Sequence, residues 1–163
     1  MLEINNREIL EQYGVDCLLV NSTNEFLVEY NLLEDNSRYK ITNFSGSTGD
    51  ALVTPETIFL FVDGRYHIQA DLEVDHSRVE VVKLLQGQKF VERLALIVGK
   101  NKTIGVFAKK NSQAQVELFK KYFNVKLLNE DIFTPEGFAK KLEIESVPGI
   151  SPEEKVQGIQ SVM

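Results

Sequence analysis

The chain has 163 residues, 43% of them hydrophobic, and a formal net charge of −6 at pH 7. That length suits a single domain with enough core to fold without metal or disulfide crosslinks. The acidic balance disfavours nucleic-acid binding, which needs clustered Lys and Arg to neutralise phosphates. The basic pairs Lys109-Lys110 and Lys120-Lys121 are therefore interpreted as solvated surface positions.

Cysteine content and hydropathy indicate the compartment. The one cysteine, Cys17, lies inside the apolar run 15–20, which predicts a buried thiol in a reducing environment. No apolar stretch approaches membrane-spanning length, and residues 1–8 lack the apolar centre of a signal peptide. We expect a cytoplasmic protein with no membrane partner.

The first elements alternate between helix and strand. Residues 3–13 are predicted to form a helix that ends at Gly14, a residue that tolerates the left-handed cap conformation. The apolar run 15–21 follows as a buried strand. Residues 22–48 are polar and show no period, so we expect a long irregular segment, which in a compact domain is usually functional or docked.

A hairpin and a helix are predicted next. Two short apolar runs, 50–54 and 58–62, flank a turn containing Pro55, whose ring pre-sets the backbone for a hairpin. Asp63 is expected to cap a helix that carries apolar residues at four-residue spacing as far as residue 74. The alternating stretch 78–84 is expected to be another strand.

The remaining pattern continues the alternation. A helix is expected over 88–98, a strand over 102–108, a helix opened by a capping box at Ser112, and a strand over 124–128. A hairpin among helix crossovers predicts an α/β domain with a mixed sheet.

The end of the chain carries a separate signal. Ser151-Pro152-Glu153-Glu154 has the residues that favour a helix start, and an apolar face follows with Val156, Ile159 and Met163. We expect residues 1–145 to form one domain and residues 146–163 a linker and the first helix of a following domain. The alternative is that this helix packs back on the same domain.

No catalytic or metal-binding set is evident. His67 and His76 are too far apart to share a helix face as zinc-binding histidines do. Ser45 and Ser47 lie in a glycine-rich turn without a G-x-S-x-G elbow or a poised histidine, and that turn lacks the Lys-Ser/Thr ending of a phosphate loop. We expect no metal or other cofactor in this chain.

Two arginines stand out, Arg38 and Arg65, each beside small polar residues. Such an arginine can clamp a carboxylate with two parallel hydrogen bonds. The alternative for either is an ion pair within the domain, for example to Glu29 or Asp63. Phe44, beside the glycine turn, is expected to fill the core or an interface.

Two blocks of sequence resemble the N-terminal domain of Xaa-Pro aminopeptidases (aminopeptidase P), in the creatinase/prolidase superfamily. The first is Arg-Tyr-Lys-Ile-Thr-Asn-Phe-Ser-Gly-Ser-Thr-Gly at 38–49, and the second is Asp-Gly-Arg-Tyr-His-Ile-Gln-Ala at 63–70. Glu29-Tyr30 resembles the end of a motif in three-domain members, which carry Asp and His where this chain has Asn24 and Phe26. Gly149-Ile150-Ser151 resembles the entry into their second domain.

The resemblance implies a ribonuclease H-like three-layer α/β fold with a mixed sheet flanked by helices. It implies that two divalent metals, manganese in most members, lie in a separate catalytic domain of an enzyme that removes an N-terminal residue preceding proline. Proline-containing peptides would then be partners of the full-length enzyme, which the resemblance suggests is a homo-oligomer such as a dimer. Arg38, Phe44 and Arg65 are the candidates for shaping active-site access or a subunit interface.

Three hypotheses follow from these observations. The first is a non-catalytic assembly or access domain of a metallo-aminopeptidase. The second is a peptide- or protein-binding module of an inactive relative. The third is the N-terminal domain of a creatinase-type amidinohydrolase.

Overall fold

The computed structural model describes residues 2–133 of the chain, which form a mixed six-stranded sheet in the order β4-β3-β2-β1-β5-β6. The strands are β1 (Cys17–Val20), β2 (Asp50–Val53), β3 (Ile58–Val62), β4 (Val79–Lys83), β5 (Thr103–Phe107) and β6 (Asn124–Leu128). The helices are α1 (Asn6–Tyr13), α2 (Ser37–Thr42), α3 (His67–Glu73), α4 (Phe90–Val98) and α5 (Gln113–Lys120), with short 3-10 turns η1 (Leu33–Asp35) and η2 (Ala108–Lys110). The expected α/β class with a mixed sheet is confirmed.

The sheet is mixed because a hairpin lies at its centre. β2 and β3 pair antiparallel around the Pro55 turn, and β1 pairs antiparallel with β2. The helix crossovers make the outer pairs parallel, namely β3 with β4, β1 with β5, and β5 with β6. The predicted hairpin and the predicted strand positions are therefore confirmed.

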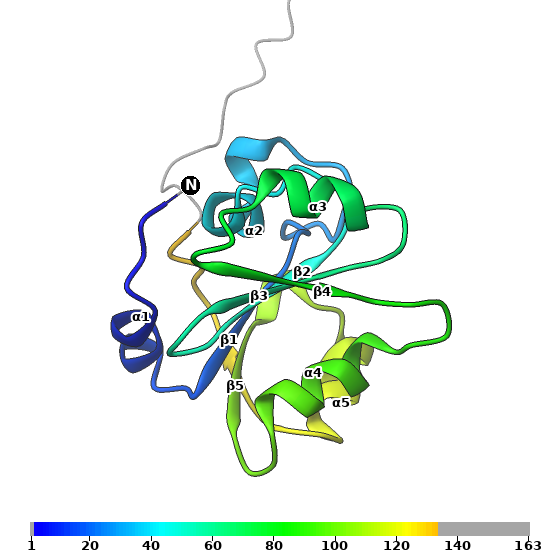
Figure 1. Ribbon diagram of the computed structural model, residues 1–163. Helices are drawn as coiled ribbons and strands as arrows, with labels where there is room; N and C mark the ends of the chain where they lie inside the picture. The colour runs from blue at the N-terminus through cyan, green and yellow to red at the C-terminus, as the bar shows by residue number, and fades with distance from the viewer. Residues whose placement is uncertain (1, 134–163) are drawn as a thin grey trace, which may run out of the picture.

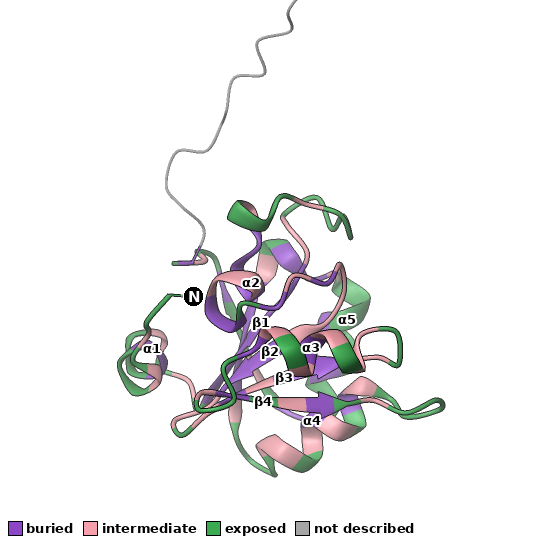
Figure 2. Ribbon diagram, turned by 45° about the horizontal axis from the view of Figure 1, so that its top comes forward, coloured by how far each residue is buried: buried purple, intermediate pink, exposed green. Residues whose placement is uncertain are grey.

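Helices cover both faces of the sheet, which gives three layers (Figure 1). Because side chains alternate along a strand, β1 sends Leu18 and Val20 to one face and Cys17 and Leu19 to the other. The first face packs against α1, α2 and α3, and the second packs against α4 and α5. Figure 2 shows the strands buried between these layers.

Local signals place most helix ends. Gly14 ends α1 in the left-handed region with φ 60°, and the capping box of Ser112 with Gln115 opens α5 as predicted. The cap expected at Asp63 is wrong: α3 begins at His67, and the Asp63 carboxylate instead accepts the Arg65 backbone N–H in the preceding turn. The helix expected at residues 151–163 lies outside the described residues.

The long segment 22–48 is not wholly irregular, which corrects the expectation. It contains η1 and the six-residue helix α2, which is capped by the Asn36 side chain accepting the Tyr39 N–H at 3.0 Å. Helix α2 is short and mostly polar, so its burial does not produce an apolar period. Arg38 is one of the buried residues of α2, and its side chain lies against the loop 43–49 that follows.

Candidate functional site

The glycine-rich loop 43–49 is held from inside by Arg38. This arginine has no exposed surface, and its guanidinium donates hydrogen bonds to the Phe44 carbonyl at 2.9 Å and the Gly46 carbonyl at 2.5 Å. The same group lies 4.7 Å from the centre of the Phe44 ring. Within residues 2–133, Arg38 forms neither the carboxylate clamp nor the ion pair with Glu29 or Asp63. Its two terminal nitrogens donate to backbone carbonyls, and its buried Nε has no hydrogen-bond partner there.

The charge on Arg38 is balanced at a distance rather than by contact. Burial lowers the pKa of Arg38 to about 10, and the carboxylates of Asp50 and Glu73 raise it in part. Burial in turn raises the pKa of Asp50, against a hydrogen bond from the Ser22 N–H at 3.0 Å. Arg38 is therefore a cation at neutral pH and acts as a structural donor for the loop.

Two glycines let the loop close over Phe44. A Cβ at Gly46 would lie 2.3 Å from the end of the Phe44 ring. Gly49 has φ 117°, and a Cβ there would lie 2.7 Å from the Phe61 carbonyl oxygen. Phe44 itself is fully buried and meets Tyr66 edge to face with ring centres 5.6 Å apart. The spacing of the motif thus encodes one compact loop.

Helix α3 fixes the loop from the other side. The Glu73 carboxylate accepts hydrogen bonds from the Ser45 N–H at 2.7 Å and the Ser45 hydroxyl at 2.8 Å, and the Gln69 amide donates to both side chains. Burial tends to raise the pKa of Glu73, but these hydrogen bonds lower it overall. The Ser45 hydroxyl therefore donates to a carboxylate whose lowered pKa makes it a weak base for activating a serine.

Arg65 lies on the surface beside the same loop. Its guanidinium donates to the Asp63 carboxylate at 2.8 and 3.1 Å and to the Thr48 hydroxyl at 3.1 Å. The intradomain ion pair considered for Arg65 is present, and hydrogen bonds from Arg65 lower the pKa of Asp63. Of the three candidate residues, only Arg65 is exposed to a partner or substrate within the described part of the chain.

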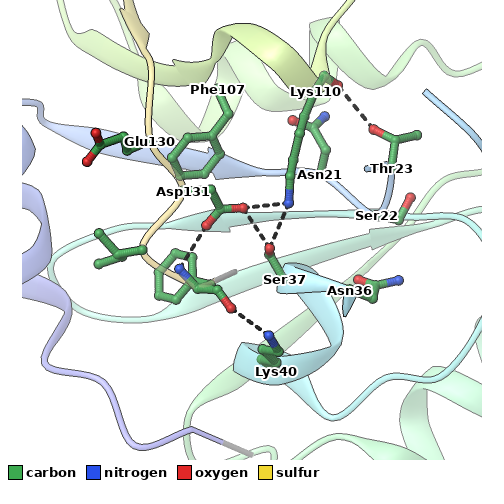
Figure 3. A network of polar contacts seen from close by, with 12 residues as sticks. Asn21, Ser22, Thr23, Asn36, Ser37, Lys40, Phe107, Lys110, Glu130 and Asp131 are labelled. Atoms are coloured by element: carbon green, nitrogen blue, oxygen red, sulfur yellow. Dashed lines mark hydrogen bonds and ion pairs between the residues drawn. The ribbon is translucent and has the colours of Figure 1, made fainter. Parts of the chain in front are cut away.

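A second polar cluster joins α2 to the segment after β6 (Figure 3). The Lys110 ammonium contacts the Asp131 carboxylate at 2.6 Å, and their side chains are only 8% and 7% exposed. Lys110 also donates to the Ser37 hydroxyl at 2.8 Å, which itself donates to Asp131 at 2.6 Å. The expectation that Lys110 is a solvated position is wrong, because it is the cation of a buried ion pair.

This cluster links three separate segments of the chain but is not arranged for catalysis. A nucleophilic serine needs a neighbouring base that is free to take its proton. Here Ser37 faces a carboxylate that is paired with a buried lysine. Asp131 also accepts the Phe133 N–H at 2.9 Å, and Tyr13 contacts the backbone on both sides of it, at Glu130 and Ile132. Sequence reasoning missed this cluster, since nothing local relates Ser37, Lys110 and Asp131.

The remaining candidate metal ligands and the cysteine do not form a site in the described part of the chain. Within residues 2–133, no three His, Cys, Asp or Glu side chains are grouped to hold a metal ion. His76 contacts the Asp71 carbonyl at 2.9 Å. Cys17 is buried as predicted, and burial raises its pKa to about 12. No helix in this part of the chain is long and apolar enough to span a membrane.

The three-layer mixed sheet and the glycine loop define a known class of domain. The chain belongs to the creatinase/prolidase N-terminal domain family, whose model matches residues 5–131. The recognised motifs at 38–49 and 63–70 lie within that match, and in the structure they meet at the loop described above.

Curated relatives are Xaa-Pro aminopeptidases. Over 71 residues the chain is 38% identical to a probable Xaa-Pro aminopeptidase P of Laccaria bicolor, covering 44% of this chain and 11% of that protein. It is 33% identical over 72 residues to Xaa-Pro aminopeptidase ApepP of Drosophila melanogaster, covering 44% of this chain and 12% of that protein. The matched segment is thus a small part of each relative.

Solved structures share the fold. The X-prolyl aminopeptidase of Caenorhabditis elegans, a cytosolic enzyme with a di-nuclear active site, matches with a TM-score of 0.66 at 20% identity, covering 91% of this chain and 27% of that one. A Streptococcus thermophilus aminopeptidase P structure matches with a TM-score of 0.59 at 20% identity, covering 79% of this chain and 89% of that one. At these identities the likeness is one of fold.

Proposed function

We propose that this chain is the non-catalytic N-terminal domain of a metal-dependent Xaa-Pro aminopeptidase, an enzyme that removes an N-terminal residue preceding proline. The observation that carries the proposal is the compact loop 43–49, built from the motif residues that resemble the family. The match to curated Xaa-Pro aminopeptidases supports it. In this proposal the described residues hold a surface in place and the bond is broken elsewhere in the enzyme.

The metals of such an enzyme would lie outside this chain. The donor residues of 2–133 do not fit a two-metal site, since no three of the usual ligand side chains are grouped. We propose two divalent metals, manganese by family resemblance, in a separate catalytic domain. The di-nuclear active site of the Caenorhabditis elegans enzyme supports the number.

The domain's role is to shape access to the active site and to support subunit assembly, with residues 1–145 as the domain and 146–163 as the linker and next helix. Arg65 is the exposed candidate for contact with a peptide or a neighbouring subunit. Arg38 and Phe44 act indirectly, through the position of loop 43–49. The Arg38 guanidinium donates to two carbonyls of that loop and so fixes its backbone. We further propose a cytoplasmic homo-oligomer, and the cytosolic Caenorhabditis elegans enzyme supports the compartment.

A paired hydrolysis assay tests this proposal. The 163-residue chain alone and the full product of its gene are each incubated with Mn²⁺ and a tripeptide that has proline in second position. We expect release of the first residue by the full product and none by the chain alone. Turnover by the chain alone would overturn the non-catalytic assignment, and inactivity of both would overturn the aminopeptidase assignment.

A further inference from the structure

Residues 24–35, which we call the acidic-apolar loop, carry six exposed apolar side chains within the eight positions 26–33. Phe26 is 77% exposed, Tyr30 80% and Leu32 60%, and Leu27, Val28 and Leu33 are also exposed. Single exposed apolar residues are ordinary on a protein surface, but a contiguous group of large ones marks an interaction site. The loop includes η1 and precedes α2, and much of the chain beside α2 is coloured as exposed in Figure 2.

The loop has a defined shape rather than a loose one. At its start, the Asn24 side chain accepts the Phe26 N–H at 3.0 Å, and the Asn24 carbonyl accepts the Leu27 N–H at 3.0 Å. Farther along, the Asn31 amide donates to the Ser22 carbonyl at 2.9 Å. These bonds hold the apolar side chains outward before any partner arrives, which lowers the entropy lost on binding.

The backbone at the tip is strained. Leu27 has φ 57°, in the left-handed region that branched, bulky side chains rarely adopt. Such conformations persist when surrounding contacts impose them, and they cluster at binding sites. Here the two hydrogen bonds to Asn24 impose the turn, and the turn presents Phe26 and Val28 to solvent.

Charge indicates what binds there. Between residues 21 and 37 the sequence has four acidic side chains, Glu25, Glu29, Glu34 and Asp35, and no Lys or Arg. Two cations lie nearby. Arg65 is already paired with Asp63, and Lys40, which interacts electrostatically with Asp35 and Glu34, donates its ammonium to the Phe133 carbonyl at 2.7 Å. A surface that is both apolar and anionic attracts a partner that is both apolar and cationic, whereas anionic lipid and nucleic acid are repelled.

We propose that the acidic-apolar loop is a docking surface for a protein segment that combines large apolar side chains with Lys or Arg. The proposal goes beyond the peptidase assignment, because binding at this loop requires no hydrolysis and is measured without it. The apolar side chains would supply the buried contact, and the carboxylates at the rim would orient the segment and speed its association.

A binding titration tests the proposal with the 163-residue chain. The probe is a fluorescein-labelled amphipathic peptide of Leu and Lys about 14 residues long, roughly four helical turns. A peptide of the same pattern with Glu in place of Lys serves as the charge control. We expect saturable binding of the Leu/Lys peptide that weakens as salt is raised, and no binding of the Leu/Glu peptide.

Matched variants then locate the site. The double variant Phe26→Ser/Tyr30→Ser removes the two aromatic contacts and should weaken binding about tenfold or more, since each buried aromatic anchor contributes roughly fivefold or more. The control Ile68→Ser/Leu72→Ser changes two residues on α3 that are 78% and 81% exposed, and it should bind like the parent chain. Circular dichroism confirms that both variants fold.

Several results would overturn the proposal. Equal weakening by the α3 control would mean that any exposed apolar pair serves, and equal binding of the Leu/Glu peptide would remove the charge argument. Sedimentation that shows self-association abolished by Phe26→Ser/Tyr30→Ser, with no binding of the Leu/Lys peptide, would identify a second copy of the chain as the occupant instead. Absence of any binding to the Leu/Lys peptide would also refute it.

Discussion

Replacing Arg38 by alanine should destabilise the fold far more than a typical surface substitution. The Arg38 guanidinium donates to the carbonyls of Phe44 and Gly46 and covers the Phe44 ring, all without exposure to water. Its removal leaves two buried acceptors without a donor and a space beneath the glycine loop. It also removes a buried charge, which offsets part of the loss.

The magnitude follows from these three effects. Each unpaired buried carbonyl costs about 1–3 kcal/mol, and truncating a large buried side chain to alanine costs about 2–5 kcal/mol. Removing the buried cation also removes its desolvation cost, which returns several kcal/mol at most. We expect a net loss of about 3–5 kcal/mol, a large fraction of the roughly 5–15 kcal/mol by which a domain is stable. Arg38→Lys keeps the charge but cannot span both carbonyls, so its loss should be intermediate.

Urea unfolding followed by far-UV circular dichroism measures these changes. Arg65→Ala is the matched control, because Arg65 lies beside the same loop but is exposed, and its unfolding midpoint should stay close to that of the parent chain. A change below about 1 kcal/mol for Arg38→Ala, within the range of ordinary surface substitutions, would show that the loop does not depend on this guanidinium.

Three further predictions follow from the other buried groups. Lys110→Met should lower the free energy of unfolding in urea by about 3–5 kcal/mol, because it leaves the buried Asp131 carboxylate without its cation. The double variant Lys110→Met/Asp131→Leu should recover most of that loss. Unchanged stability of Lys110→Met would contradict this reasoning. Because burial raises the pKa of Cys17 to about 12, a thiol reagent at about pH 8 should label the native chain slowly and the urea-unfolded chain fast, and equal rates would contradict a buried thiol. Glu73 has a pKa lowered from 4.5, so its contribution to stability is complete above that pH and is lost as the pH falls through the lowered pKa. Glu73→Gln should therefore flatten the stability profile below pH 4.5 and leave its slope above that pH unchanged. An unchanged slope below pH 4.5 would count against the loop contacts.

Sequence reasoning predicted the elements whose signals are local. Apolar runs located the strands, a proline turn located the hairpin, and Ser112 located the start of α5, since each depends on residues within a few positions. The mixed sheet followed from the order of those elements. Helix α2 was missed because its buried residues include Arg38, whose burial depends on carbonyls that lie outside the helix.

The candidate site was predictable only in part. The motif marked the loop, and the ion pair of Arg65 with Asp63 was foreseen because the two residues are only two positions apart in the sequence. The ion pair of Lys110 with Asp131 was not foreseen, since the two residues are 21 positions apart. Ser37, which is hydrogen-bonded to both, is 73 positions from Lys110. From the sequence alone a lysine is expected at the surface, and the burial of Lys110 arises only from the tertiary fold.

One lysine meets both ends of the described chain. The Lys40 carbonyl accepts the Leu2 N–H at 2.6 Å, and the Lys40 ammonium donates to the Phe133 carbonyl at 2.7 Å. Residues 2 and 133 are therefore both held by the same lysine. A pulling force applied between those residues would act first on the two bonds to Lys40 and then on the buried pair of Lys110 with Asp131, before it reached the ladder of six strands.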